Sequence, residues 1–413
     1  MNISVFNQYF FPDTAATAQL LTDLCVGLGK THEVSVICGA PSYNPSEPRQ
    51  VKAPFKSEVF SGVKVTRVGS TTFTRAKMTG RLSNYLTYLA LAPLAGRCNS
   101  KAQVALALTD PPPVGILAWC AARLQNIPMV WSIRDLHPDI GVQLGKINNR
   151  ALIALIASTT RFVLKRADRI IVLGETMRQR VISKGAPPAR VVVIPDWADT
   201  DAIVPKLKDN SVSRRRGLND KFTVMYSGNI GLSQGLETFI ETAYYLREHQ
   251  DIRFVLVGDG AGKPKLEQLV EEKGLSNVRF FPYESKALLS ESFACGDVHL
   301  VPLRRGLAGY IVPSKVYAVM ASGRPFIAAV EDDCELVSMA SEYGSGVVVP
   351  PDEPHPLVST ILELKQDPDR VLAMGQRARE AAVSQFSRRI GVERYDALLN
   401  KVVSERKCSA YNG

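Results

Sequence analysis

The sequence has no uninterrupted run of the roughly 20 apolar residues that a helix needs to span a bilayer. Its seven cysteines include no close pair, and most lie in apolar runs. This spacing argues against a zinc site and a disulfide framework, and it favours reduced thiols in a cytoplasm. The basic residues are not interleaved with aromatic residues and no recognition motif is found, so nucleic acid is not an expected partner.

In other respects the chain is typical of a globular protein. With 413 residues, of which 46% are hydrophobic, it is long enough to bury two cores, and its length suggests two or three domains. It opens directly on a strand-like stretch, Met1 to Val5, which leaves no room for a signal peptide. We therefore expect a cytoplasmic protein.

Positive charge is concentrated in the first half. Residues 1–199 hold 23 Lys and Arg against 12 Asp and Glu, a net +11, whereas the whole chain carries +10. Two apolar segments of this half, Tyr85 to Leu94 and Ala151 to Val163, have basic flanks. The flanking residues are Arg75, Lys77, Arg81, Arg97, Lys101, Lys165, Arg166 and Arg169. Such segments suit helices lying in an anionic membrane interface, and buried core helices with solvated ends are the alternative.

Short apolar strands alternate with helix-like segments in two runs. The expected strands of the first run are Ile3 to Phe6, Glu33 to Cys38, Val63 to Val68, Val104 to Leu108, Met129 to Ile133, Ile170 to Leu173 and Val191 to Ile194. Those of the second are Phe222 to Tyr226, Phe254 to Val257, Val278 to Phe280, Val298 to Val301, Phe326 to Ala329 and Gly346 to Val349. This alternation predicts two doubly wound α/β domains, each with a parallel sheet covered on both faces. Ligands of such sheets bind at the carboxyl ends of the strands, so the cleft between the domains is the expected site.

Three strand ends of the first domain carry candidate chemistry, and one of them is Thr109-Asp110-Pro111-Pro112-Pro113 after the fourth strand. After the first strand, Thr14, Ala15, Ala16 and Thr17 open a helix with small side chains and hydroxyls, which would let backbone donors approach a phosphate or an acceptor; an ordinary helix start is the alternative. After the fifth strand, residues 134–139 place two carboxylates, a guanidinium and an imidazole within six positions. Asp135 and His137 are therefore candidate functional residues.

The second domain has three further strand ends that could hold a nucleotide. Tyr226 to Glu237 reads as a strand, a glycine loop and a helix start, and Leu256 to Gly260 ends a strand in a loop able to take a ribose or a phosphate. Phe280 to Tyr283 ends another strand where a flat base could lie against the backbone. Each pattern is weak alone, but together they indicate one nucleotide-binding edge.

A fourth candidate segment for nucleotide binding is residues 312–325. It reads as a loop followed by an apolar helix, and the helix ends at a glycine. Ser314 is a good N-cap, and Lys315 adds a positive charge where the helix dipole is already positive. Unpaired N–H groups of the first turn are expected to point outward. These features predict an anion site that suits a diphosphate, and an ordinary capped helix is the alternative.

The combination of motifs resembles the retaining glycosyltransferases of family four with the GT-B fold. The resemblance is strongest to the bacterial branch that builds O-antigen and capsule, such as the N-acetyl-L-fucosamine transferases. It runs nearly end to end and rests on Asn7 to Asp13, Ala18 to Leu21, Val193 to Thr200, Ser227-Gly228-Asn229, Gly258-Asp259-Gly260 and Pro313-Ser314-Lys315.

The resemblance implies an acceptor-binding domain at 1–197, a nucleotide-sugar donor domain at 198–385 and a C-terminal helix, 386–413, that packs back on the first domain. It assigns donor binding to Gly228, Asn229, Gln234, Gly258, Asp259, Gly260, Pro282, Tyr283, Ser314 and Lys315. The sequence also departs from the family. Asn229 and Gln234 replace a basic pair, with Arg304 or Arg305 as possible substitutes, and Tyr310 and Ala318 stand where relatives have an acidic pair.

The resemblance therefore implies an enzyme that moves a sugar, with retention, from a UDP-sugar to a lipid-linked or saccharide acceptor on the inner face of the plasma membrane. No cofactor and no metal are expected, and the acidic pairs Asp199/Asp201 and Asp367/Asp369 are interpreted as structural. A UDP-sugar 2-epimerase of the same fold and an inactive binding subunit of a polysaccharide assembly complex are the alternatives. Sugar, linkage and acceptor do not follow from the sequence.

Overall fold

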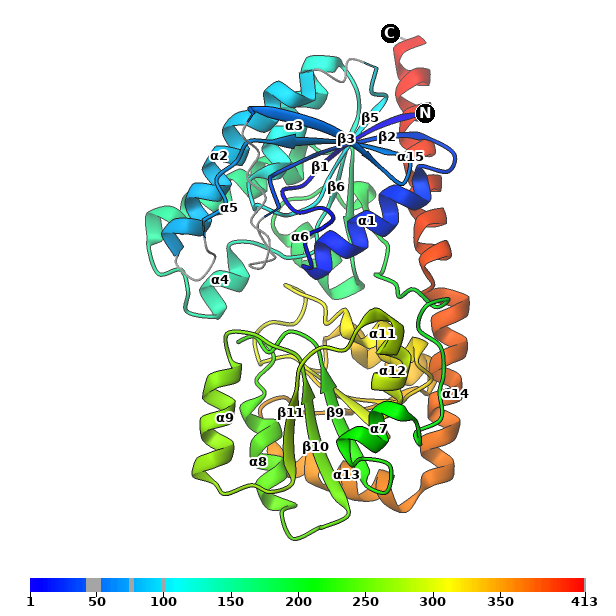
Figure 1. The fold of residues 1–413 in the computed structure, drawn as a ribbon. Helices are drawn as coiled ribbons and strands as arrows, with labels where there is room; N and C mark the ends of the chain where they lie inside the picture. Colours follow the sequence, from blue (N-terminus) through cyan, green and yellow to red (C-terminus); the bar gives the residue numbers. More distant parts are fainter. Residues whose placement is uncertain (42–52, 74–77, 98–100, 412–413) are drawn as a thin grey trace. The chain divides into compact units, whose positions relative to one another are not determined.

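The computed structural model describes residues 1–41, 53–73, 78–97 and 101–411 (Figure 1). The chain divides into two compact units, one made of residues 1–195 and 389–413 and the other of residues 196–388. These divisions fall within three residues of the limits drawn from the sequence. The predicted basic flanks Arg75 and Lys77 lie outside the described residues.

The first unit is built on an eight-stranded sheet in the order β3-β4-β2-β1-β5-β6-β7-β8. Its strands are β1 (Asn2–Phe6), β2 (Glu33–Cys38), β3 (Phe55–Phe60), β4 (Val63–Val68), β5 (Val104–Ala107), β6 (Met129–Ser132), β7 (Arg169–Val172) and β8 (Val191–Val193). All neighbouring strands run parallel except β3 and β4. The edge strand β3 was not predicted, because most of its residues are exposed and it lacks the apolar run of a buried strand.

Helices cover both faces of this sheet. They are α1 (Ala16–Leu28), α2 (Met78–Arg97), α3 (Val114–Gln125), α4 (Asp139–Gln143), α5 (Arg150–Arg166), α6 (Glu175–Ser183) and α15 (Arg388–Tyr411), with the 3-10 helix η1 (Pro188–Arg190). Consecutive residues of β6 show the two layers. Trp131 packs where α3 and α5 meet, whereas the hydroxyl of Ser132 lies 2.7 Å from that of Tyr395 on α15. Helix α15 is further joined to this unit by His32 and Asp396, whose side chains are 2.5 Å apart.

The two apolar segments with basic flanks form parts of α2 and α5. Leu86 and Leu94 of α2 and Leu152 and Leu155 of α5 are exposed. Among the described residues, no helix combines the length and the apolar character needed to cross a membrane.

The second unit holds a six-stranded sheet in the order β11-β10-β9-β12-β13-β14, with every pair parallel. The strands are β9 (Phe222–Ser227), β10 (Ile252–Val257), β11 (Val278–Phe281), β12 (Val298–Pro302), β13 (Phe326–Ala329) and β14 (Gly346–Val349). All six were predicted, because a strand buried on both faces reads as a continuous apolar run. The expectation of two α/β domains is confirmed.

Two layers of helices enclose this second sheet (Figure 1). The helices are α7 (Ser211–Arg216), α8 (Glu237–Tyr245), α9 (Lys263–Glu272), α10 (Leu289–Ala294), α11 (Lys315–Ala321), α12 (Glu335–Tyr343), α13 (Pro354–Gln366) and α14 (Pro368–Gln385), with the 3-10 helix η2 (Lys286–Leu288). On one face, Phe239 of α8 and Ile361 of α13 pack on Phe254. On the other, Val212 of α7 packs with Val255 and Cys295. Because the sheet is parallel, the loops after β9, β10 and β11 all lie at the carboxyl ends of the strands. We refer to this end of the sheet as its carboxyl edge.

Candidate functional site

The central feature of the second unit is the side chain of Lys315, which lies across Gly228. Gly228 follows β9 directly and has φ +142°, a conformation that L side chains rarely adopt. A Cβ at this position would stand 2.2 Å from Cε and 2.8 Å from Cδ of Lys315. The Lys315 Nζ lies 5.4 Å from the centroid of the Tyr226 ring, on the same strand end. The sequence motifs around Gly228 and Lys315 are thus brought into contact.

The Lys315 ammonium is the unbalanced charge of this edge. Burial lowers the pKa of Lys315 from 10.5 to about 8, so most of the side chains are still charged at pH 7. Lys315 forms no ion pair and no hydrogen bond with any residue that the structure describes. A buried charge without a partner is unfavourable, and an anion would relieve it.

Gly228, Gly258 and Gly260 place no side chain of their own over the backbone at this edge, and we call this surface the glycine floor. A Cβ on Gly258, at the end of β10, would stand 2.1 Å from the carbonyl oxygen of Gly228. A Cβ on Gly260 would stand 2.4 Å from the carbonyl oxygen of Ile230. The Gly258 N–H donates to the Phe281 carbonyl at 2.9 Å, which continues the β10–β11 pairing. The loops after β9 and β10 are therefore packed backbone on backbone, and nothing larger than glycine fits between them.

Asn229 and Gln234 lie on either side of Gly231. A Cβ on Gly231 would be 2.9 Å from the amide nitrogen of Asn229 and 2.9 Å from Oε1 of Gln234. The Gln234 Oε1 accepts a hydrogen bond from the Gly231 N–H at 3.0 Å, and its Nε2 donates to Ser233 at 2.8 Å. Gln234 thus shapes the glycine loop, and neither Asn229 nor Gln234 brings a positive charge to it.

Tyr226, at the end of β9, also belongs to this edge, although the sequence pattern assigned it no role. Its hydroxyl donates to the Asn229 carbonyl at 2.5 Å, which fixes the turn after β9. Burial raises the pKa of Tyr226 well above its usual value, and the nearby Tyr283 adds to this effect. Its place immediately before the Ser227-Gly228-Asn229 motif was the only indication in the sequence.

Tyr283 and Asp259 complete the edge on the β10–β11 side. Tyr283 is 55% exposed, and its Cζ would lie 3.3 Å from a Cβ on Gly258, so the ring stands beside the glycine floor. It follows Pro282 directly after β11. The Asp259 side chain accepts from the Gly260 N–H at 2.9 Å, and the Asp259 carbonyl accepts from the Ile230 N–H at 2.9 Å. The predicted donor-binding residues of these three loops are therefore gathered at one end of the sheet.

The expected cap of α11 is wrong. Ser314 has helical φ and ψ angles and makes no side-chain capping hydrogen bond. The N–H groups of Val316 and Tyr317 donate to the carbonyls of Pro313 and Ser314 at 3.3 Å, so they are not free for a ligand. The helix has only seven residues, and its dipole is correspondingly small. The charge of Lys315, rather than the helix terminus, is the anion-attracting feature.

Arg304 and Arg305, the two suggested substitutes for the basic pair, are both engaged with carboxylates. Arg304 donates to Glu237 at 2.9 Å, and Arg305 donates to Glu353 at 3.0 Å. Burial raises the pKa of Glu237, but hydrogen bonds from its own N–H and from Lys265, together with the charge of Arg304, bring it below its usual value. These ion pairs brace the loops around the edge.

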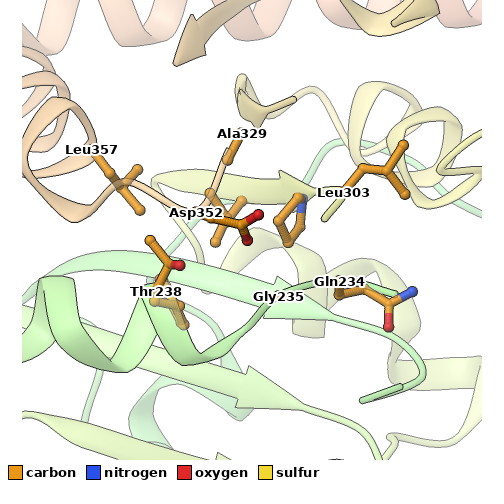
Figure 2. Close-up of a pocket in the computed structure, with 10 residues that line it drawn as sticks. Gln234, Gly235, Thr238, Leu303, Ala329, Asp352 and Leu357 are labelled. Atoms are coloured by element: carbon orange, nitrogen blue, oxygen red, sulfur yellow. The ribbon is translucent and has the colours of Figure 1, made fainter. Parts of the chain in front are cut away.

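A small pocket lies beside the glycine loop (Figure 2). It is lined by Gly235, Thr238, Leu303 and Asp352 among others, and it has room for about one water molecule. The Asp352 Oδ2 accepts from the Arg305 N–H at 3.1 Å, and its Oδ1 would lie 2.7 Å from a Cβ on Gly235. A nucleotide sugar does not fit this pocket, so it is part of the packing behind the loop.

In the first unit, Thr14 to Thr17 lie at the start of α1. The helix begins at Ala16, and Ala15 occupies the N-cap position without a side-chain hydrogen bond. The Gln19 N–H donates to the Ala15 carbonyl at 3.0 Å, and the Gln19 side chain donates to the Thr14 carbonyl at 2.8 Å. The loop is an exposed helix start, and its predicted role in binding stays a prediction.

His137 follows β6, and it is influenced by two carboxylates, Asp110 after β5 and Asp139 two residues further along the chain. Burial lowers the pKa of His137, and the charges of Asp110 and Asp139 partly oppose this shift. The imidazole is therefore mainly neutral at pH 7. Asp139 is paired with Lys184 at 2.7 Å. Asp110 follows β5 and belongs to the strand end Thr109 to Pro113, which the sequence singled out without a role for this carboxylate. The roles predicted for His137 and Asp135 remain predictions.

The acidic pairs Asp199/Asp201 and Asp367/Asp369 were interpreted as structural, and Asp199 and Asp367 do stabilise the local backbone. Asp199 accepts from the N–H groups of Asp201 and Ala202 and pairs with Arg388 at 2.9 Å. Asp367 caps α14 by accepting from the Arg370 N–H at 2.9 Å. In the part of the chain that the structure describes, no group of three or more His, Cys, Asp or Glu is arranged to hold a metal ion.

Family comparisons agree with this architecture. Residues 16–197 match the family described as glycosyl transferase 4-like domain, and residues 221–367 match the family described as glycosyl transferases group 1. Together the two ranges take in most of the chain, which therefore belongs to the glycosyltransferases of the GT-B fold. The matched ranges separate where the two units divide.

One curated protein and two solved structures illustrate what this chain is similar to. WcaI of Escherichia coli K12, a candidate colanic acid biosynthesis glycosyl transferase, is 33% identical over 248 residues, which cover 58% of this chain and 60% of WcaI. Sucrose-phosphate synthase from Thermosynechococcus elongatus has a TM-score of 0.77 at 17% identity and covers 98% of this chain and 100% of its own. HepE from Anabaena in complex with UDP has a TM-score of 0.73 at 15% identity, with 97% and 100% covered. At these identities the solved structures show the fold alone.

Proposed function

We propose that this protein transfers a sugar from a UDP-sugar to a lipid-linked or saccharide acceptor in the synthesis of a cell-surface polysaccharide. The family membership supports sugar transfer, and the likeness to WcaI supports polysaccharide synthesis. The donor sugar would be N-acetylated and deoxygenated, as in the N-acetyl-L-fucosamine transferases that the sequence resembles. The second unit would bind the donor and the first unit the acceptor.

The unpaired ammonium of Lys315 over the glycine floor is the observation that carries the proposal. A diphosphate would place oxygens against Lys315 and against the bare backbone near Gly228 and Gly258. The nucleoside end would then reach Pro282 and Tyr283, where an aromatic ring is exposed beside the backbone. HepE, of similar fold, was solved with UDP, which supports UDP as the nucleotide.

We further propose that the anomeric configuration is retained. A front-face reaction would suit this site, because it needs no protein base opposite the leaving group. The bond from the anomeric carbon to the diphosphate oxygen breaks, the acceptor oxygen forms the new bond on the same face, and the leaving diphosphate takes the acceptor proton. Lys315 would stabilise the charge that develops on the leaving group, and His137 with Asp135 would orient the sugar or the acceptor.

The acceptor's lipid would be reached at an anionic membrane surface. The first unit carries the excess of positive charge, and α5 exposes Leu152 and Leu155 at its start while Arg161, Lys165 and Arg166 are exposed near its end. Apolar and basic groups on one helix suit an interfacial position. We propose the inner face of the plasma membrane as this surface.

A panel of radiolabelled UDP-sugars, incubated with and without lipid extract, tests the proposal. Release of UDP that depends on lipid extract, with label moving to the lipid phase, is the expected result. Conversion of the sugar without an acceptor would instead identify a 2-epimerase, and binding without turnover of any donor would identify an inactive subunit. Either of these outcomes overturns the proposed transfer.

A further inference from the structure

Arg216 and Glu284 form a buried ion pair at the end of β11, although they are 68 residues apart in the sequence. Arg216 is the last residue of α7, and Glu284 follows Tyr283. The Glu284 Oε1 accepts from Nη2 of Arg216 at 2.7 Å and from Nη2 of Arg215 at 2.6 Å. The guanidinium of Arg216 also lies over the Phe281 ring, 4.3 Å from its centroid. Arg216 thus contacts the residues on both sides of Pro282 and Tyr283.

Burial separates this pair from the ordinary surface pairs of the protein. The side chains of Arg216 and Glu284 are 3% and 13% exposed. On the same helix, the ion pair of Arg214 with Asp209 has side chains that are 66% and 59% exposed. An exposed pair contributes little, whereas removing one partner of a buried pair leaves an uncompensated charge. The position of Glu284 is therefore strongly coupled to Arg216.

Arg216 lies on helix α7, which several contacts hold in place, whereas the turn that contains Glu284 has no regular secondary structure. Helix α7 is fixed by a capping box at Asn210, by the packing of Val212 in the core and by a 2.5 Å hydrogen bond from Ser211 to Glu291 on α10. Residues 282–285 have no helix or strand of their own, and they link β11 to η2. Their exposed Tyr283 stands beside Gly258.

We propose that Arg216 and Glu284 are positioning residues that hold the Pro282–Tyr283 turn in place for the nucleoside end of a nucleoside diphosphate. The inference rests on the proposed function, because it takes the turn as the nucleoside subsite. The pair then sets the affinity for UDP without affecting the affinity for the diphosphate group, which depends on Lys315. Neither residue has to touch the ligand.

Calorimetric titration of the full chain with UDP and with inorganic pyrophosphate tests this division. Arg216→Gln and Glu284→Gln are expected to weaken UDP about five- to twentyfold and to change pyrophosphate affinity by less than about twofold. The double variant should lose clearly less UDP affinity than the sum of the two single losses, because the contact between Arg216 and Glu284 is shared by both residues. Arg214→Gln, on the exposed side of the same helix, is the matched control and should bind both ligands normally.

Amide hydrogen exchange without ligand provides a second measurement. Arg216→Gln should speed exchange at residues 283–285, and Arg214→Gln should not. Normal UDP affinity in both Arg216→Gln and Glu284→Gln, equal losses for UDP and pyrophosphate, or unchanged exchange would overturn the inference. Lys315→Ala separates this failure from that of the proposed function. If Lys315→Ala weakens UDP while the Arg216 and Glu284 variants do not, only the inference fails, and if Lys315→Ala has no effect, the donor site itself is wrong.

Discussion

Lys315 occupies the space that any side chain at position 228 would need. Gly228 follows β9, and Lys315 begins α11, which follows β12. The contact forms because β9 and β12 are neighbours in the sheet. The glycine keeps the lysine stem over Tyr226, and the stem in turn requires the glycine. An amino acid change at either position would therefore disturb the same feature, the unpaired ammonium at the strand ends.

Lys315→Ala should weaken UDP roughly ten- to a hundredfold, because a charge-assisted contact of about 1.5 to 3 kcal/mol is lost. Calorimetric titration measures this loss. Lys365→Ala is the matched control, since Lys365 is also partly buried but pairs with Asp251, which precedes β10 at the opposite end of the sheet. Normal UDP affinity in folded Lys315→Ala would contradict the assignment.

The stability of the second unit should depend on pH through Lys315. The pKa of Lys315 is about 8 in the folded protein and about 10.5 in the unfolded chain, so the unfolded chain binds more protons between these values. The lysine therefore destabilises the fold progressively as the pH falls from about 10.5 to 8, and fully below 8. Lys315→Met should stabilise the unit at pH 7 by up to about 3 kcal/mol, because each unit of pKa difference corresponds to about 1.4 kcal/mol.

Urea unfolding at pH 7 and pH 10 measures this dependence, with Lys365→Met as the control for a lost lysine. The gain from Lys315→Met should be mostly gone at pH 10. A gain of equal size at both pH values would mean that packing, and not the charge, is responsible.

Gly258→Ala should destabilise the second unit by about 2 to 4 kcal/mol. The new Cβ would stand 2.1 Å from the Gly228 carbonyl oxygen, a backbone atom that has little freedom to move, and the φ of +146° adds strain. Gly274→Ala is the matched control. Its φ of +59° is also strained, but nothing lies within 4 Å of its Cβ, so about 1 kcal/mol is expected. Equal losses in the two variants, measured by urea unfolding, would contradict the close approach of the two loops.

His137→Ala should lower kcat while leaving UDP affinity nearly unchanged, because the imidazole is expected to act on the sugar or acceptor in the transition state. His355→Ala is the control, since His355 is exposed and lies in the other unit, where its ring packs against Tyr245 at an interplanar angle of 42°. Turnover and calorimetry with one donor give both quantities. A His137→Ala enzyme with normal turnover would remove this loop from the mechanism, and an inverted product by NMR would exclude the front-face route.

Binding to vesicles should require both the charge of the first unit and the exposed leucines of α5. The protein should sediment with anionic vesicles at low salt and dissociate as salt rises, because surface attraction is screened within about 10 Å at 0.1 M. Leu152→Ser with Leu155→Ser should weaken this binding severalfold. Leu207→Ser, at an even more exposed leucine of the other unit, should not. Equal binding to neutral vesicles, or none at low salt, would make α5 an ordinary surface helix.

The sequence alone was sufficient for the parallel strands of both sheets, because strands buried on both faces are rich in apolar residues, as β10 is from Phe254 to Val257. It also predicted which loops would meet, since parallel strands end at the same edge. The exposed edge strand β3 was missed for the opposite reason, because its residues carry no burial pattern. The expected cap at Ser314 failed because local hydrogen bonding in a seven-residue helix used the N–H groups first.

Contacts between segments that are distant in the sequence were decided only by the tertiary structure. No sequence pattern joins Gly228 to Lys315, or Arg216 to Glu284, because each pair is formed by the packing of separate strands and helices. The sequence likewise suggested that Arg304 or Arg305 assists Lys315 with the phosphate charge, and the structure pairs these arginines with Glu237 and Glu353. Composition and periodicity determine which residues are buried, but the charge left unpaired at the site depends on which side chains the fold brings within hydrogen-bonding distance.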